Sequence, residues 1–258
     1  MTTQQEQATL LATLHIKGNP LILFNIWDAG SAKALEEVGA KAIATGSKSV
    51  ALAHGYEDGE KLPFPLVVAT IEQIVRSVTL PVTIDLEGGY GITPDEVAAS
   101  AAQAIAAGAA GINFEDQIVG GTGLYSIEAQ CLRIAAVRQA AEQAGVPLFI
   151  NARTDIFLKA KPADQNDEHL AEAIERATAY AEAGASGFFA PGLGDAAKIE
   201  TLCNRSPLPV NIIIFPHAST PRHLAELGVA RISYGPAPYN AMIAALKAAG
   251  RVALGFEK

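Results

Sequence analysis

Short runs of apolar residues recur along the chain, and each is followed by a stretch with the spacing of a helix. The runs are continuously apolar instead of alternating with polar residues, which is typical of parallel strands buried on both faces. Eight runs are expected to form strands, at residues 21–25, 42–46, 82–86, 111–115, 148–152, 187–191, 211–215 and 231–235.

The helical stretches carry their own start and stop signals. In residues 93–108, Thr93 stands at the N-cap position, Pro94 begins the first turn and Gly108 follows the last turn. Similar signals predict helices at 28–39, 126–145, 167–184 and 220–228, with a lead-in helix in 1–20 and a last helix in 238–258. Eight strand–helix units in 258 residues predict a single α/β domain spanning residues 1–258, a (β/α)₈ TIM barrel.

A doubly wound sheet is the alternative fold. It is disfavoured because the first strand is followed by FNIWDAG and not by a glycine-rich nucleotide loop. Residues 47–67 form the longest interruption between predicted elements. Since loops of that length in compact domains are often functional, we expect this one to contribute to a site.

Composition narrows the classes of function. A formal net charge of −8 without basic runs argues against nucleic acid and anionic membranes as partners. Cys131 and Cys203 fall in helical patterns outside any C-x-x-C pair, so neither a disulfide framework nor a structural zinc site is expected. The N-terminus lacks a basic region and a long apolar core, and no apolar run reaches spanning length, which predicts a cytoplasmic protein.

Two carboxylates end the third predicted strand in the stretch TIDLEGGYG, residues 83–91. Strand alternation would put Asp85 and Glu87 on one side, whereas Glu115 and Asp116 after the next strand would point opposite ways. Acids gathered at the carboxyl ends of barrel strands repel one another unless a cation lies among them, and oxygen ligands suit Mg²⁺ or Mn²⁺. The pattern predicts a metal site of Asp85, Glu87 and Glu115.

Arg153, at the end of the fifth predicted strand, is the expected partner of an anionic ligand. A guanidinium binds a carboxylate or phosphonate through two parallel hydrogen bonds. Gly46 and Ser47 offer backbone N–H groups close to a ligand, and Trp27 and Lys48 also lie at strand ends on the predicted substrate side. A cation, an arginine and amide donors together fit a 2-oxo acid bound as its enolate.

Simpler structural roles remain open for several of these residues. Glu115 and Arg153 can form a structural salt bridge, and both roles can hold at once. Asp58 can be a solvated loop acid, and Trp27 can pack at the rim of the barrel. His217 is expected to lead into the helix that follows it.

Several segments resemble, in the same order, the isocitrate lyase/phosphoenolpyruvate mutase superfamily: DAGSAKALEEVGAKAIATGSKSVA, HGYEDGE, TIDLEGGYG, GINFEDQ, NARTDIFL and GASGFFAPGL. The resemblance implies a (β/α)₈ barrel whose last helix is exchanged between subunits of a homo-oligomer, usually a tetramer. It also implies a Mg²⁺ ion held, directly or through water, by the acids at positions 85, 87 and 115, with Asp58 nearby. The 2-oxo acid end of the ligand would be held by Gly46, Ser47 and Arg153.

The chemistry of this superfamily makes or breaks a C–C or P–C bond next to a pyruvate-type enolate. Its isocitrate and methylisocitrate lyases carry a Lys-[Lys/Arg]-Cys-Gly-His loop after the fourth strand, and its phosphonate enzymes carry a Lys-Thr-Asn-Ser element. This chain has EDQIVGGTGLYSIE there, which matches neither.

The resemblance therefore predicts a Mg²⁺-dependent lyase that cleaves a small 2-oxo or 2-hydroxy dicarboxylic acid by retro-aldol reaction or decarboxylation. Asp58 or Tyr125, acting through water, would move the proton, and Arg153 would hold the reacting end. The alternatives are a P–C bond enzyme of the phosphonopyruvate hydrolase or mutase type, a metal-free aldolase with a Schiff base on Lys48 or Lys159, and a 2-oxo acid binder without turnover.

Overall fold

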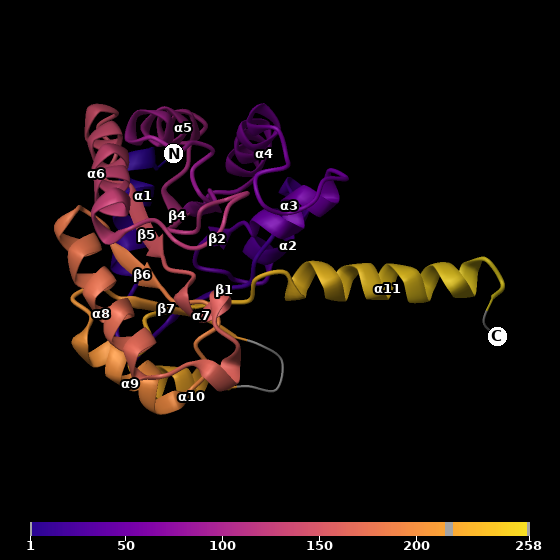
Figure 1. Cartoon of the computed structure of the whole chain (residues 1–258). Coiled ribbons are helices and arrows are strands. Elements are labelled where there is room, and N and C mark those ends of the chain that lie inside the picture. The colour runs from indigo at the N-terminus through magenta and orange to yellow at the C-terminus, as the bar shows by residue number, and fades with distance from the viewer. Residues whose placement is uncertain (1, 215–218, 257–258) are drawn as a thin grey trace.

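The computed structural model describes residues 2–214 and 219–256, and a barrel of eight parallel strands lies at its centre (Figure 1). The strands are β1 (Leu21–Leu23), β2 (Ile43–Ala44), β3 (Val82–Asp85), β4 (Gly111–Glu115), β5 (Phe149–Arg153), β6 (Gly187–Phe189), β7 (Val210–Ile213) and β8 (Arg231–Ser233). They pair in the order β1-β8-β7-β6-β5-β4-β3-β2, and a parallel bridge between Ile26 and Thr45 joins β1 to β2. The (β/α)₈ barrel and all eight predicted strands are confirmed, although residue 215 and His217 lie outside the described residues.

Helices alternate with the strands and surround them (Figure 1). They are α1 (Gln4–Thr13), α2 (Ala29–Glu37), α3 (Ser47–Ala53), α4 (Phe64–Ser77), α5 (Pro94–Ala106), α6 (Ile127–Gln143), α7 (Ile156–Lys159), α8 (Asp167–Glu182), α9 (Ala196–Arg205), α10 (Pro221–Glu226) and α11 (Ala237–Ala253). The predicted caps are present: Thr93 accepts from the N–H of Glu96 while the Glu96 carboxylate accepts from the N–H of Thr93. Gly108 ends this helix at φ +103°, a conformation that favours glycine.

Two sequence-based boundaries were wrong. The lead-in helix is confined to α1, because a turn and a short bridge between Ile16 and Asn19 occupy the chain before β1. The predicted loop 47–67 contains the helix α3, which buries Ser49, Val50 and Ala51, and α4 already begins at Phe64. The connection between these helices is therefore residues 54–63, which we call the β2 loop.

The barrel interior below the site is polar. Asn151 donates to Asn113 and to Asn211 at 2.9 and 3.0 Å, and the buried Arg231 donates to Asn113 at 3.0 Å. The isoleucines next to these residues in β4, β5, β7 and β8 are buried apolar positions: Ile112, Ile150, Ile212 and Ile232. A hydrogen-bonded layer of this kind fixes the relative heights of the strands, and thereby of the side chains at their carboxyl ends.

The last helix, α11, projects away from the barrel (Figure 1). Of its side chains only Pro238 is buried, and Leu246 and Val252 are each 63% exposed. Within the described ranges, no helix has both the length and the hydropathy to cross a bilayer.

Candidate active site

The carboxyl ends of β3, β4 and β5 bring Asp85, Glu115 and Arg153 to one end of the barrel. The register of strand pairing sets their positions along the barrel axis, because Asp85 is paired with Asn113 and Glu115 with Arg153. These are the strand ends at which (β/α)₈ enzymes place their chemistry.

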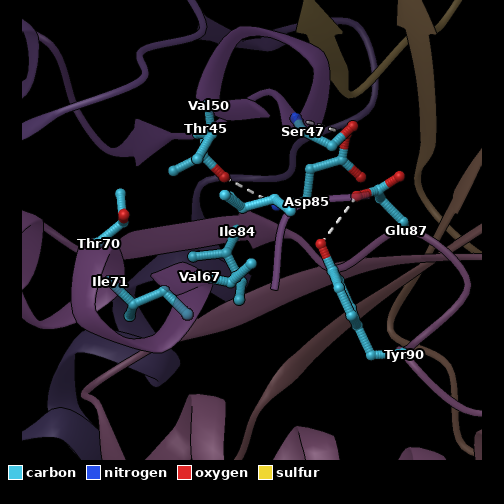
Figure 2. Close-up of a pocket in the computed structure, with 11 residues that line it drawn as sticks. Thr45, Ser47, Val50, Val67, Thr70, Ile71, Ile84, Asp85, Glu87 and Tyr90 are labelled. Atoms are coloured by element: carbon cyan, nitrogen blue, oxygen red, sulfur yellow. Dashed lines mark hydrogen bonds between the residues drawn. The ribbon is translucent and has the colours of Figure 1, made fainter. Parts of the chain in front are cut away.

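Asp85 is held by the start of α3 (Figure 2). Its Oδ2 accepts hydrogen bonds from the backbone N–H and the hydroxyl of Ser47 at 3.2 and 2.9 Å. Its own N–H donates to Thr45 Oγ1 at 2.9 Å. Gly46 precedes α3, so the Ser47 N–H is one of the helix-terminal donors that have no partner within the helix. Asp85 Oδ1 is buried and has no hydrogen-bond partner among residues 2–214 and 219–256, which is costly for a carboxylate unless a cation or a water meets it.

Glu87 reaches the same cavity by a route that the sequence did not predict (Figure 2). It lies beyond the end of β3 with φ +52°, so strand alternation does not place it beside Asp85; a left-handed turn does. Its Oε2 accepts from the N–H groups of Gly59 and Glu60 at 2.9 and 2.8 Å, and its Oε1 accepts from the Tyr90 hydroxyl at 3.1 Å. Burial, together with the negative charge of Asp85, raises the pKa of Glu87 to about 7.

Glu115 and Arg153 form the salt bridge considered from the sequence, with Oε2 2.8 Å from Nη1. Gln117 donates to the other oxygen of Glu115 at 3.2 Å. Arg153 also meets Asp155 in a two-point contact, Nε to Oδ1 at 2.6 Å and Nη2 to Oδ2 at 3.0 Å. Burial raises the pKa of Glu115 despite the opposing charge of Arg153. Burial alone would lower the pKa of Arg153, but Glu115 and Asp155 raise it.

The other predicted site residues are distributed around this cluster. Asp58 lies at the surface of the β2 loop, where partial desolvation and the charge of Asp85 raise its pKa. Lys48 is exposed in the first turn of α3. Trp27 packs edge-on against Tyr239 of α11, with ring centroids 5.2 Å apart. The Tyr125 ring lies 4.0 Å from the guanidinium of a buried arginine in α6.

The residues present fit a hard cation held mainly through water. Asp85 Oδ1 is an unpartnered buried oxygen, and the acids Glu87 and Glu115 add negative charge close to it. No group of three His, Cys, Asp or Glu side chains within residues 2–214 and 219–256 is arranged to hold an ion. Because protein donors already occupy the oxygens of Glu87 and Glu115, Asp85 is the candidate direct ligand, which suits Mg²⁺ with its retained waters.

A second buried network of hydrogen bonds, which the sequence did not predict, positions Arg153 through Asp155. Asp116 points away from Glu115, as predicted, and its Oδ2 accepts from Tyr180 at 2.9 Å and from Arg176 at 3.2 Å. Its Oδ1 accepts from the N–H of Asp155 at 3.0 Å, and Asp155 in turn holds the guanidinium. The only sign of this network in the sequence was the Glu-Asp pair at 115–116, because the partners of Asp116 on α8 lie 60 and 64 residues away.

The loop after β4 is short and folds back on itself. Gln117 and Leu124 form an antiparallel bridge, and the N–H of Tyr125 donates to the carbonyl of Asp116 at 2.8 Å. Residues 117–125 contain no cysteine, histidine or lysine. Tyr125 is therefore the one residue of this loop with a titratable side chain.

A barrel of eight parallel strands with carboxylates and a clamped arginine at its carboxyl ends defines the class of (β/α)₈-barrel enzymes. Within that class the chain belongs to the phosphoenolpyruvate phosphomutase family, whose sequence model matches residues 10–254. The family resemblance read from the sequence is confirmed.

Among its relatives, an uncharacterized Mycobacterium tuberculosis protein, Rv1998c, is 35% identical over 92% of this chain and 86% of that protein. The 2-methylisocitrate lyase of Escherichia coli K12 is 29% identical over 92% of this chain and 79% of the enzyme.

Solved structures give the same assignment. A Burkholderia cenocepacia J2315 protein, provisionally named as a phosphonomutase, is 47% identical with a TM-score of 0.94, covering 98% of this chain and 99% of that one. A phosphonopyruvate hydrolase in complex with oxalate and Mg²⁺ shares the fold at 21% identity, with a TM-score of 0.82 over 98% of this chain and 88% of that one. The relatives thus include proteins named as lyases and as a phosphoenolpyruvate phosphomutase.

Proposed function

We propose that the protein is a Mg²⁺-dependent lyase that cleaves a C–C bond of a small 2-oxo or 2-hydroxy dicarboxylic acid. The observation that carries the proposal is the unpartnered buried oxygen of Asp85 among acids that face a clamped arginine. Such a cluster balances its charges when a divalent cation and an anionic ligand enter together. The relatives named 2-methylisocitrate lyase and oxaloacetate decarboxylase act on ligands of this chemistry.

Each residue has a role in this proposal. Asp85 would hold the ion directly, and Glu87 and Glu115 would hold its waters. Arg153 keeps N–H donors beyond those used by Glu115 and Asp155, and these would bind the carboxylate of the 2-oxo acid. Mg²⁺, when bound, would supply stabilisation of the negative charge that develops on the oxygen of a pyruvate-type enolate.

The ligand has to lie at the mouth of the barrel. The cavity beside Asp85 and Glu87 has a volume of about 20 Å³, room for about one water, and Val67, Ile71 and Ile84 line its apolar side (Figure 2). A dicarboxylic acid is larger, so it must extend toward Asp58 and Arg153. Asp58, whose pKa is raised, is the better placed of the two proposed acid–base residues, because Tyr125 packs on an arginine.

A P–C bond enzyme is the second candidate. It is favoured by the 47% identity to the protein provisionally named as a phosphonomutase, and it would use the same cation and arginine. A Schiff-base aldolase has less support, because Lys48 and Lys159 are both exposed and a Schiff-base lysine is usually activated by desolvation. A 2-oxo acid binder would keep the same site without turnover.

A ligand screen by thermal shift tests the proposal. We expect oxalate, pyruvate, oxaloacetate, methylisocitrate or dimethylmalate to raise the melting temperature only when Mg²⁺ is present, because a ligand that binds the folded state stabilises it by mass action. The ligands that shift the transition are then assayed for pyruvate formation. Phosphate release from phosphonopyruvate would favour the P–C enzyme, and no Mg²⁺-dependent shift with any ligand would contradict the proposal.

We also propose that the protein is a homo-oligomer in which α11 packs on a neighbouring subunit. A groove of about 630 Å³ runs beside β1, lined mostly by apolar residues that include Ile16, Ile22, Phe24 and Val38. Phe24 is 44% exposed and Val38 79% exposed, and α11 presents Leu246 to solvent. The groove and the exposed side of α11 both carry apolar side chains. If α11 of one subunit covers the groove of another, both surfaces lose apolar area exposed to water. The cytoplasmic setting remains a prediction from Cys131 and Cys203, which form no disulfide.

Substitution of Leu246 by Glu tests the exchange. We expect L246E to be monomeric where the wild type is oligomeric, because a charge would be buried against the groove. Sedimentation velocity measures the change, with Lys161→Glu, an exposed charge substitution in the β5–α8 connection, as the control. An L246E protein with the wild-type sedimentation coefficient would contradict the exchange.

A further inference from the structure

Strained backbone gathers at one place in the chain. In residues 2–214 and 219–256, the non-glycine residues with positive φ are Glu60 at +58°, Glu87 at +52° and Tyr90 at +53°. A left-handed conformation costs a non-glycine residue on the order of 1 kcal/mol or more, so such residues persist where the surroundings hold them and are concentrated at functional sites.

Hydrogen bonds join these three residues directly. The N–H of Glu60 donates to Glu87 Oε2 at 2.8 Å, and the N–H of Tyr90 donates to Glu60 Oε1 at 2.8 Å. The Tyr90 hydroxyl donates to Glu87 Oε1 at 3.1 Å, as Figure 2 shows for this last pair. We call Glu60, Glu87 and Tyr90 the clasp. It connects the β2 loop to the turn that follows β3.

The β3 side of the clasp is anchored independently. Arg133, which is 2% exposed, donates through Nη2 to the carbonyls of Gly88 and Gly91, the latter at 3.0 Å. A Cβ on Gly89 would lie 2.7 Å from the Phe114 ring, so the turn is seated directly against β4. The turn is therefore fixed with or without the clasp, and the element whose position depends on the clasp is the β2 loop.

The β2 loop carries Asp58, two residues before Glu60. Gly59, between them, also donates its N–H to Glu87, at 2.9 Å. The backbone on the C-terminal side of Asp58 is thus held at two successive N–H groups, and the carboxylate of Glu60 adds a third connection through Tyr90.

We propose that Glu60 is a positioning residue for the active site. Its side chain makes no hydrogen bond or ion pair with the predicted metal ligand Asp85 or with Arg153 among the described residues. It acts by holding the β2 loop, which carries Asp58 close enough to Asp85 for their charges to interact. This role rests on the proposed function of the barrel mouth as a site for Mg²⁺ and a 2-oxo acid. The required property of residue 60 is an oxygen acceptor for the Tyr90 N–H, which glutamine retains and alanine lacks.

Hydrogen–deuterium exchange of the metal-free protein tests the structural half of the proposal. We expect Glu60→Ala to accelerate exchange in peptides covering 57–61 by about tenfold, while the anchored turn changes only at the Tyr90 N–H, which loses its acceptor. Glu60→Gln should exchange like the wild type. Glu57→Ala, which removes an exposed acid of the same loop, is the control. Wild-type exchange in Glu60→Ala would overturn the proposal.

Titration calorimetry with Mg²⁺ and oxalate tests the functional half. We expect Glu60→Ala to weaken binding by about tenfold or more, as loss of a residue that orients metal ligands usually does, and Glu60→Gln to restore it. Equal binding by wild type and Glu60→Ala, or a Glu60→Gln variant as weak as Glu60→Ala, would overturn the role of the acceptor oxygen. A wild type that binds neither Mg²⁺ nor oxalate would overturn the proposed function instead, and the exchange experiment would then still decide whether Glu60 holds the loop.

Discussion

Asp85→Ala is expected to abolish Mg²⁺ binding and to lower kcat/KM by about 10³-fold or more. The reason is that Oδ1 of Asp85 is the unpartnered buried oxygen at the mouth, whereas the oxygens of Glu87 and Glu115 already accept hydrogen bonds from the protein. A cation that stabilises developing charge contributes several kcal/mol, and about 4 kcal/mol corresponds to a factor of 10³ in rate. Titration calorimetry and turnover of the substrate identified in the ligand screen measure the two effects.

The matched control is Asp95→Ala, which removes an exposed carboxylate in the first turn of α5. It should bind Mg²⁺ like the wild type. If Asp85→Ala retains both Mg²⁺ affinity and turnover, Asp85 is not the direct ligand and the assignment of the metal site is wrong.

Arg153→Met is expected to cost about 3–5 kcal/mol of stability and to weaken oxalate binding by about 10²-fold or more. The guanidinium faces Glu115 and Asp155, which are 4% and 1% exposed, so its removal leaves two buried carboxylates without their cation. Urea denaturation measures the first effect, and calorimetry in the presence of Mg²⁺ measures the second.

Arg153→Lys separates charge from geometry. A lysine keeps the charge and should recover part of the stability, but it lacks the planar fork that meets Asp155 at two points and should not recover oxalate binding. Arg205→Met, at an exposed position in the last turn of α9, is the control for losing a guanidinium. Wild-type oxalate affinity in Arg153→Met would show that the arginine serves only as a structural ion pair.

The fold could be predicted because its signals are local. Apolar runs buried on both faces mark the strands, and caps such as Thr93 and Gly108 mark the helix ends. The helix α3 was missed because it is a short segment of seven residues that begins after Gly46 without a side-chain cap. The start of α4 has no capping side chain either, and its two prolines, Pro63 and Pro65, are also typical of loops.

The site could be predicted only in part, because some of its contacts leave no local signal in the sequence. Asp85, Glu115 and Arg153 are the last residues of β3, β4 and β5, and the ends of parallel strands meet at one edge, so their proximity follows from the fold. The left-handed backbone of Glu87 and its hydrogen bonds to Gly59 and Glu60 depend on contacts 27 and 28 residues away, which no local pattern contains.

A crystal structure with Mn²⁺ in place of Mg²⁺, together with oxalate, tests the central claim most directly, since Mn²⁺ is located by its anomalous scattering. We predict one anomalous peak at the barrel mouth about 2.0–2.2 Å from Asp85 Oδ1, with oxalate between the ion and the Arg153 guanidinium. An ion bound elsewhere, or no peak at the mouth at saturating Mn²⁺ and oxalate, would contradict the account.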